Sequence, residues 1–133
     1  MDTPPAATRH LAVGRFGERL ALVLLWLKGY RLRHRNWRAG RLELDLVMER
    51  RGTLVFVEVK ARSDRGWGGP AAAVDAEKQA NLVRAASAYL GRFGLWERPC
   101  RFDVVLVQRR DGRFGWRVRH LRDAIRPDLG RRM

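Results

Sequence analysis

The sequence predicts an α/β fold in which a mixed β-sheet is flanked by helices. Segments with helical and strand periodicity follow one another in the order helix, strand, strand, helix, strand, strand. A chain of 133 residues with 46% hydrophobic residues and five Trp can fill the core of one such domain. We therefore expect a single domain over residues 1–133, with loose ends at about residues 1–8 and 127–133.

Apolar residues at helical spacing predict the two helices. The first extends from about Arg9 to Gly29, where the glycine is a natural stop. The second extends from about Ala76 to Phe93, and Asp75 is its expected N-cap. The segment before it, residues 62–73, has the Gly-rich composition of a loop.

Alternating apolar and polar residues predict the strands. Leucines alternate with Glu43 and Asp45 in the first strand, and valines alternate with Glu58 and Lys60 in the second, over 53–61. A charged turn at 49–52 joins them. The last two strands are expected around residues 101–106 and 114–121, with a turn at Asp111-Gly112 between them and an ion pair between Arg101 and Asp103.

The register of the first two strands decides which charged residues meet. If Leu42, Leu44 and Leu46 share a buried face with Val55, Val57 and Val59, the charged residues of both strands meet on the opposite face. These charged residues are Glu43, Asp45, Glu58 and Lys60. A four-residue connection is expected to place Asp45 opposite Glu58, and a two-residue connection to place Glu43 there.

Two interpretations of this charged face are open. It is either the solvent-exposed face of a hairpin, where Glu43 and Lys60 form an ion pair worth ~0–1 kcal/mol, or a cation site. The second interpretation is supported because Val47, Leu54 and Phe56 share the same face and indicate that protein covers it. Carboxylates gathered in a partly buried place repel one another unless a cation compensates them, and Mg²⁺ prefers such hard oxygen ligands.

The composition points to a polyanionic partner. The formal net charge is +14, and nucleic acid is the leading candidate partner. Three of the 28 basic residues are Lys, so 25 are Arg, and Lys28, Lys60 and Lys78 are candidates for places where a compact ammonium matters. The single cysteine excludes a disulfide scaffold. No apolar run is long enough to span a membrane and no secretory segment follows Met1, so we expect a cytoplasmic protein that does not bind membranes.

Asp45 followed thirteen residues later by Glu58-Val59-Lys60 resembles the PD-(D/E)xK nuclease signature. Its sequence context resembles the YraN family over about residues 13–107, a group of bacterial proteins assigned a nuclease-like fold similar to that of archaeal Holliday junction resolvases. The segments that carry this resemblance are Gly17-Glu18, Glu43-Leu44-Asp45-Leu46, Val55-Phe56-Val57-Glu58-Val59-Lys60 with Arg62, Lys78, and Arg101-Phe102-Asp103-Val104-Val105. The usual Gly-Gly before the first acidic residue is replaced here by Arg41-Leu42.

The resemblance implies a restriction-endonuclease-like fold and a role for each residue of the motif. Asp45 and Glu58 would bind Mg²⁺ or Mn²⁺, together with the backbone carbonyl of Val59. Lys60 would orient or activate the attacking water, which is chemistry that an Arg could not perform by giving up a proton. Glu18 would be a further or water-mediated metal ligand, its alternative being an exposed position on the first helix.

Other residues have less defined expected roles. Glu43 is a metal ligand, a partner of Lys60 or a hydrogen-bonding support for Arg62. Lys78 is either a surface residue of the second helix or a phosphate contact. Trp67 either anchors its loop or stacks on a base. The expected phosphate contacts are Arg31, Arg33, Arg35, Arg38, Arg62 and Arg65.

These observations predict a metal-dependent endonuclease that acts on DNA, with branched DNA as a candidate substrate. The alternatives are a nucleic-acid-binding module that keeps the fold without cleavage, and a basic interaction protein whose carboxylates are structural. A junction resolvase would require two active sites in a symmetric dimer, which makes a homodimer a candidate assembly.

Overall fold

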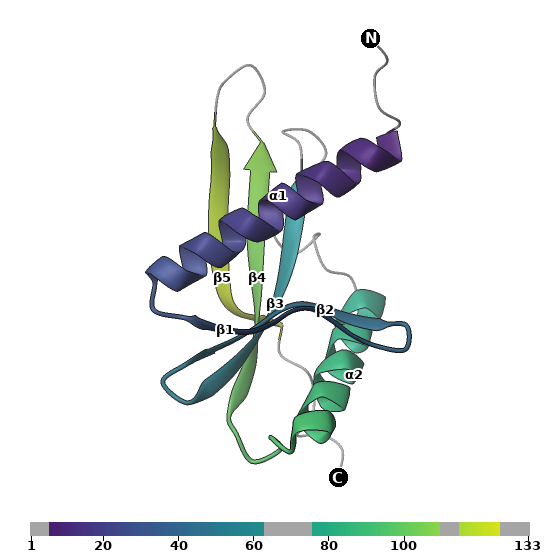
Figure 1. The fold of residues 1–133 in the computed structure, drawn as a ribbon, viewed down its shortest axis with the longest axis vertical. Coiled ribbons are helices and arrows are strands. Elements are labelled where there is room, and N and C mark those ends of the chain that lie inside the picture. The colour runs from purple at the N-terminus through teal and green to yellow at the C-terminus, as the bar shows by residue number, and fades with distance from the viewer. Residues whose placement is uncertain (1–5, 63–75, 110–114, 126–133) are drawn as a thin grey trace.

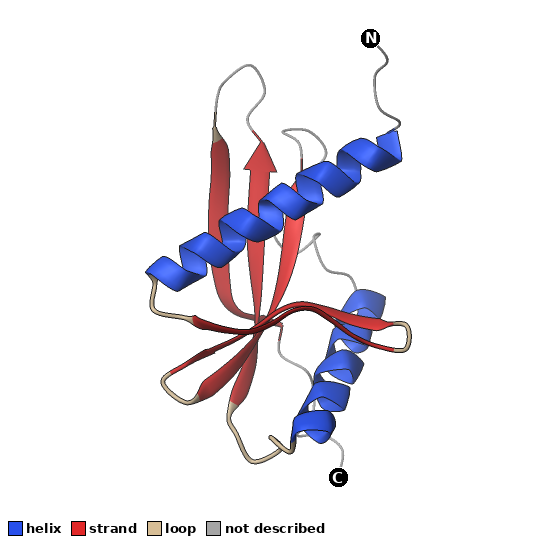
Figure 2. Cartoon of the chain, viewed as in Figure 1, coloured by secondary structure: helices blue, strands red, loops and turns tan. Residues whose placement is uncertain are grey.

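The computed structural model describes residues 6–62, 76–109 and 115–125 and confirms the predicted α/β class (Figures 1 and 2). The elements are α1 (Ala6–Leu27), β1 (Arg31–Ala39), β2 (Leu42–Arg50), β3 (Thr53–Arg62), α2 (Ala76–Phe93), β4 (Cys100–Arg109) and β5 (Trp116–Ile125). The five strands form one sheet in the order β1-β2-β3-β4-β5. Only β3 and β4 are parallel, and the other neighbouring pairs are antiparallel. This mixed sheet with flanking helices is consistent with a restriction-endonuclease-like fold.

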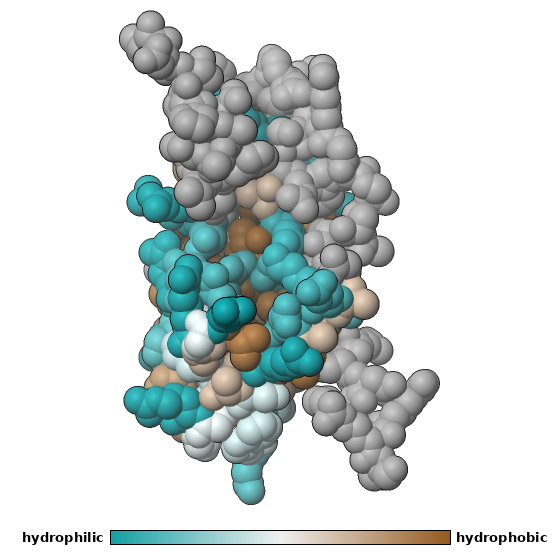
Figure 3. Space-filling view, turned by 90° about the vertical axis from the view of Figure 1, so that its right-hand side faces the viewer, coloured by the Kyte–Doolittle hydropathy of each residue, from teal (hydrophilic) through white to brown (hydrophobic). Residues whose placement is uncertain are grey.

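The two helices cover opposite faces of the sheet, and each encloses its own hydrophobic core. On the α1 side, Leu25 packs with Val57 and Val105. On the α2 side, Tyr89 packs with Phe56. Seen from the side on which α2 lies, the described surface is largely hydrophilic, with apolar residues visible between the polar ones (Figure 3). No helix in the described part of the chain is long and apolar enough to cross a membrane.

The strand β1 was not predicted from the sequence. Its residues include four arginines, and most of its side chains are exposed or only half-buried, so it lacks the apolar alternation that marks a strand. The register against β2 also shifts between Leu32 and His34, which breaks the period of two. The strand exists because its backbone pairs along nearly the whole of β2.

The expectation that Leu42, Leu44 and Leu46 share one face is wrong. Leu42 and Leu44 pack in the core on the α2 side, whereas Leu46 packs in the core on the α1 side. The change of face occurs at Asp45. On the neighbouring strand, Asn36 lies between the pairs Arg35↔Leu46 and Trp37↔Leu44 and has a φ of 49°. The strands therefore twist sharply at this point, and leucines on both sides of Asp45 are buried in different cores.

The connection between β2 and β3 is a two-residue turn, Arg51-Gly52, with φ values of 50° and 84°. Such a pair of positive φ values belongs to a type I′ hairpin turn. Arg50 pairs with Thr53, so counting five residues outward on each strand places Asp45 opposite Glu58. The two expectations for the connection are therefore interchanged: the two-residue turn places Asp45 opposite Glu58, whereas a four-residue connection over 49–52 would place Glu43 there.

Pairing between β2 and β3 ends at Leu46↔Val57, although both strands continue. Beyond this point β2 pairs with β1, and β3 pairs with β4. Figure 1 shows the far end of the β1–β2 hairpin turning away from β3 towards α2. The resulting split in the sheet brings charged residues of two strands to its edges.

Candidate active site

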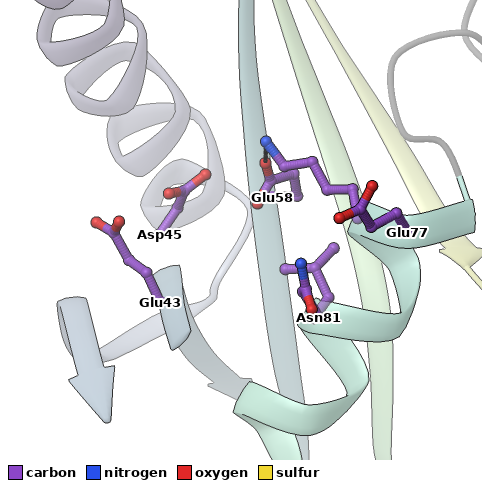
Figure 4. Close-up of a pocket in the computed structure, with 7 residues that line it drawn as sticks. Glu43, Asp45, Glu58, Glu77 and Asn81 are labelled. Carbon is purple, nitrogen blue, oxygen red and sulfur yellow. Dashed lines mark ion pairs between the residues drawn. The ribbon is translucent and has the colours of Figure 1, made fainter. Parts of the chain in front are cut away.

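A pocket lies in this split, between β2, β3 and the beginning of α2. Its volume is about 380 Å³. In Figure 4, Glu43 and Asp45 lie on one side of the pocket, and Glu58 lies beside the beginning of α2, near Glu77. The polar residues that line the pocket are Glu43 and Asp45 from β2, Glu58 from β3, and Glu77, Lys78 and Asn81 from α2. Glu43, Asp45 and Glu58 thus line one pocket, as the alternation of the two strands predicts.

The Asp45 side chain accepts a hydrogen bond from the backbone of β3 just beyond the point where the pairing of β2 and β3 ends. The backbone N–H of Val59 donates to Asp45 Oδ2 at 2.9 Å. Burial and the neighbouring charge of Glu58 nevertheless raise the pKa of Asp45 to about 8. In the absence of a bound cation, burial and the charge of Glu58 therefore favour the protonated form of Asp45.

Glu58 is 5% exposed and is compensated by two ammonium groups. Lys78 Nζ lies 2.8 Å from Glu58 Oε1, and Lys60 Nζ lies 3.4 Å from the same oxygen. Burial and the adjacent Lys78 lower the pKa of Lys60, although Glu58 opposes the shift. Burial acts in the same direction on Lys78, but its contacts with Glu58 prevail and raise its pKa. Lys78 is thus half-exposed on the first turn of α2, and its ammonium group lies beside Glu58 at the pocket, a contact that was not predicted from the sequence.

Glu18 on α1 interacts electrostatically with Glu43 and Glu58. Its neighbour Gly17 packs against β3, where an added Cβ would lie 3.0 Å from the Cβ of Ala61. Burial raises the pKa of Glu18, opposed by a hydrogen bond to Asn36 and the charge of Arg35, whereas the charges of Glu43 and Glu58 add to the rise. Glu18 thus lies close enough to interact with the carboxylates, but it does not line the pocket.

Glu43 has a different partner from the one expected. Its Oε2 lies 3.6 Å from Arg38 Nη2, whereas Lys60 pairs with Glu58. This ion pair is exposed on both sides, so it leaves Glu43 accessible at the rim of the pocket.

The arginines proposed to contact phosphates have varied surroundings. Arg33 donates to the Tyr89 hydroxyl at 3.0 Å and pairs with Glu49 at 3.8 Å. Arg31 and Arg35 are exposed on β1. The side chain of Arg62, and all of Arg65 and Trp67, lie outside the described residues, as do Asp75, the Asp111-Gly112 turn and the predicted loose ends.

Sequence reasoning missed the pocket residues Glu77 and Asn81 and two arginines on β5. Glu77 and Asn81 lie four residues apart and therefore on one face of α2, which is the only sequence signal they offer. Arg119 pairs with Leu106, which in turn pairs with Lys60, and this register places Arg119 on the same sheet face as Lys60. Arg117 lies two residues before Arg119 and therefore on the same face of the sheet. Both arginines are exposed.

The donor set fits a hard divalent cation. Among the residues whose positions are described, no three His, Cys, Asp or Glu side chains converge closely enough to form a complete ligand cluster. Mg²⁺ does not require one, because it is usually held by one or two carboxylates and completes its shell with water and substrate phosphates. Asp45 and Glu58 are two such carboxylates with interacting charges, and a bound cation would favour the ionised form of Asp45 in place of the protonated one.

Comparison with known proteins gives a family for this arrangement. Residues 17–107 match the family described as "Uncharacterised protein family UPF0102", which is more than half of the chain. The chain belongs to this family. UPF0102 is the YraN family, so the match confirms the family expected from the sequence. The matched range contains Glu18 and every polar residue that lines the pocket, whereas β5 lies beyond it.

Individual UPF0102 proteins are similar over most of the chain. One from Bacteroides thetaiotaomicron is 42% identical over 120 residues, covering 90% of this chain and 97% of the relative. One from Pseudomonas syringae pv. tomato is 46% identical over 111 residues, covering 83% and 86%. One from Oleidesulfovibrio alaskensis is 49% identical over 98 residues, covering 74% of this chain and 48% of the relative, so the match spans about half of that protein.

Proposed function

We propose that this protein is a metal-dependent endonuclease that hydrolyses phosphodiester bonds of DNA, with branched DNA as a candidate substrate. The observation that carries the proposal is the meeting of Asp45, Glu58 and Lys60 at the split between β2 and β3. The formal net charge of +14 supplies the attraction to a polyanionic substrate.

Asp45 and Glu58 would hold the Mg²⁺ or Mn²⁺ ion, with Glu18 interacting from α1. Such an ion, when bound, lowers the pKa of water and stabilises negative charge on a phosphoryl group. Glu58 holds the Lys60 ammonium 3.4 Å away, in a side chain that is only 13% exposed. From this position Lys60 would orient the attacking water and stabilise the charge that develops on the phosphate oxygens.

Lys60→Ala is expected to lower the cleavage rate by about 10²–10³-fold, the usual loss when one group that stabilises transition-state charge is removed. Lys60→Arg should not restore the rate, because the planar guanidinium is bulkier and does not give up a proton. The measurement is the single-turnover cleavage rate of plasmid and branched DNA with Mg²⁺ or Mn²⁺. Arg84→Ala, an exposed change on α2 outside the pocket, is the control. Equal rates for wild type and Lys60→Ala would remove Lys60 from the mechanism.

One observation favours a second candidate, a nucleic-acid-binding module without cleavage. Within the described ranges 6–62, 76–109 and 115–125, two carboxylates meet closely but no complete ligand cluster is preformed. This candidate predicts DNA binding that is unaffected by EDTA and no divalent-cation-dependent cleavage by the wild-type protein.

The phosphate-binding surface is expected to include the sheet face next to Lys60. The double variant Arg117→Ala/Arg119→Ala should weaken DNA binding about tenfold at 0.1 M salt and reduce the slope of log affinity against log salt by up to about 2, because each phosphate contact contributes about 0.9. The control is Arg15→Ala/Arg19→Ala, which removes the same charge from exposed positions on α1. Equal weakening by both double variants would indicate that net charge alone governs binding. Fluorescence anisotropy at several salt concentrations measures both quantities.

A further inference from the structure

We propose that Lys78 is a tethered cation that competes with the divalent ion for Glu58 and thereby sets the metal affinity of the site. This inference rests on the proposed function and adds a regulatory element to it. In the free protein the Lys78 ammonium occupies Glu58, and metal binding requires it to leave.

The closeness of the contact carries the proposal. Lys78 Nζ lies 2.8 Å from Glu58 Oε1, which is shorter than the 3.4 Å distance from Lys60 Nζ to the same oxygen. The Glu58 side chain is only 6% exposed, so solvent screens the interaction weakly. A divalent ion held by Glu58 would lie close to both ammonium groups, and repulsion between the like charges would favour the departure of one of them.

The two lysines differ in their freedom to leave. The side chain of Lys60 is 13% exposed, whereas that of Lys78 is 42% exposed and projects from the first turn of α2 on a flexible stem. The helix dipole disfavours a cation at the N-terminus of a helix, so it does not stabilise the Lys78 ammonium at this position. The ion pair with Glu58 does stabilise it there. Compensation of Glu58 by a metal ion would therefore release Lys78 while Lys60 stays in place.

The test is Mn²⁺ binding by the full-length chain in the absence of DNA, with free Mn²⁺ measured by electron paramagnetic resonance. Lys78→Met and Lys78→Gln should each lower the Kd about tenfold, which corresponds to ~1.4 kcal/mol. Lys78→Arg, which keeps the charge, should remain within about threefold of wild type. Arg84→Met removes one positive charge from an exposed position of the same helix and should leave the Kd unchanged.

Each outcome has a defined meaning. An unchanged or higher Kd in both neutral Lys78 variants overturns the proposal, and so does equal tightening by Arg84→Met, which would assign the effect to net charge. Absence of Mn²⁺ binding in every variant overturns both this inference and the metal-dependent function. Tighter Mn²⁺ binding without DNA cleavage by the wild type overturns only the endonuclease, whereas cleavage by the wild type with no effect of Lys78 on affinity overturns only this inference.

Discussion

Asp45→Asn is expected to stabilise the protein by about 2–4 kcal/mol at pH 7 in the absence of divalent cations, because each unit of pKa shift corresponds to about 1.4 kcal/mol. Burial and Glu58 raise the pKa of Asp45 to about 8, so folding requires this group to take up a proton that it lacks in the unfolded chain. Asn imitates the protonated acid. Its carbonyl can accept from the Val59 N–H and its amide can donate to Glu58, without the cost of proton uptake.

The pH dependence follows from the same shift. The folded pKa of Asp45 is raised from 3.8 to about 8, so its contribution to stability is present in full below pH 3.8 and is lost as the pH rises towards 8. The stability difference between Asp45→Asn and wild type should therefore grow by up to about 1.4 kcal/mol per pH unit within this window. Urea denaturation in EDTA at pH 5.5 and 7.5 measures it. A variant that is less stable than wild type at both pH values would contradict the expectation.

Asp103→Asn is expected to have the opposite effect, a loss of about 3–5 kcal/mol, which is typical when one partner of a buried ion pair is removed. Asp103 is completely buried. It accepts from Arg101 Nε at 3.0 Å and from the Asp123 backbone N–H at 2.9 Å, and His120 Nε2 lies 2.7 Å from its other oxygen. An Asn amide group would point hydrogen atoms at one or more of these donors. The expected ion pair between Arg101 and Asp103 is thus confirmed as part of a larger network that joins β4 to β5.

The sign of the pH effect also differs from that of Asp45. Burial opposes ionisation of Asp103, but its hydrogen bonds to His120, Arg101 and Asp123 outweigh burial and hold its pKa below the usual 3.8. Its contribution to stability is therefore present above pH 3.8 and is lost as the pH falls through the lower folded value. Thermal and urea denaturation at pH 7 test the prediction, with Glu97→Gln as an exposed control that removes the same charge. A loss below about 1 kcal/mol would show that the network contributes little, since exposed substitutions usually change stability by less than ~0.5 kcal/mol.

The parts of the fold and site that sequence could predict depend on local patterns. The order of helical and strand patterns predicted the fold class. Strand alternation predicted that Glu43, Asp45 and Glu58 lie close together, because neighbouring strands joined by a short turn have few registers. The change of face at Asp45 escaped prediction because it follows from the twist opposite Asn36. Such a twist depends on the neighbouring strand β1, and it does not change the alternation of apolar and polar residues in the sequence of β2.

The contribution of α2 to the pocket could not be predicted for a different reason. Lys78 reaches Glu58, and Asn81 lines the same pocket, because a helix distant in sequence docks on the sheet. No local sequence pattern specifies how such a helix is positioned against the strands. The Arg117 and Arg119 face likewise depends on pairing across three strands. Motif spacing predicted which carboxylates of β2 and β3 meet, whereas long-range packing determined which further side chains join them.

The most direct test of the central claim is divalent-cation-dependent cleavage of plasmid and branched DNA by wild type and Asp45→Asn, purified identically and compared at equal DNA occupancy. The account predicts cleavage by wild type with Mg²⁺ or Mn²⁺, none in EDTA, and a loss of at least about 10²-fold in Asp45→Asn with DNA binding retained. Lack of cleavage by the wild type under all conditions, or equal cleavage by both proteins, would contradict the assignment of Asp45 and Glu58 to an endonuclease active site.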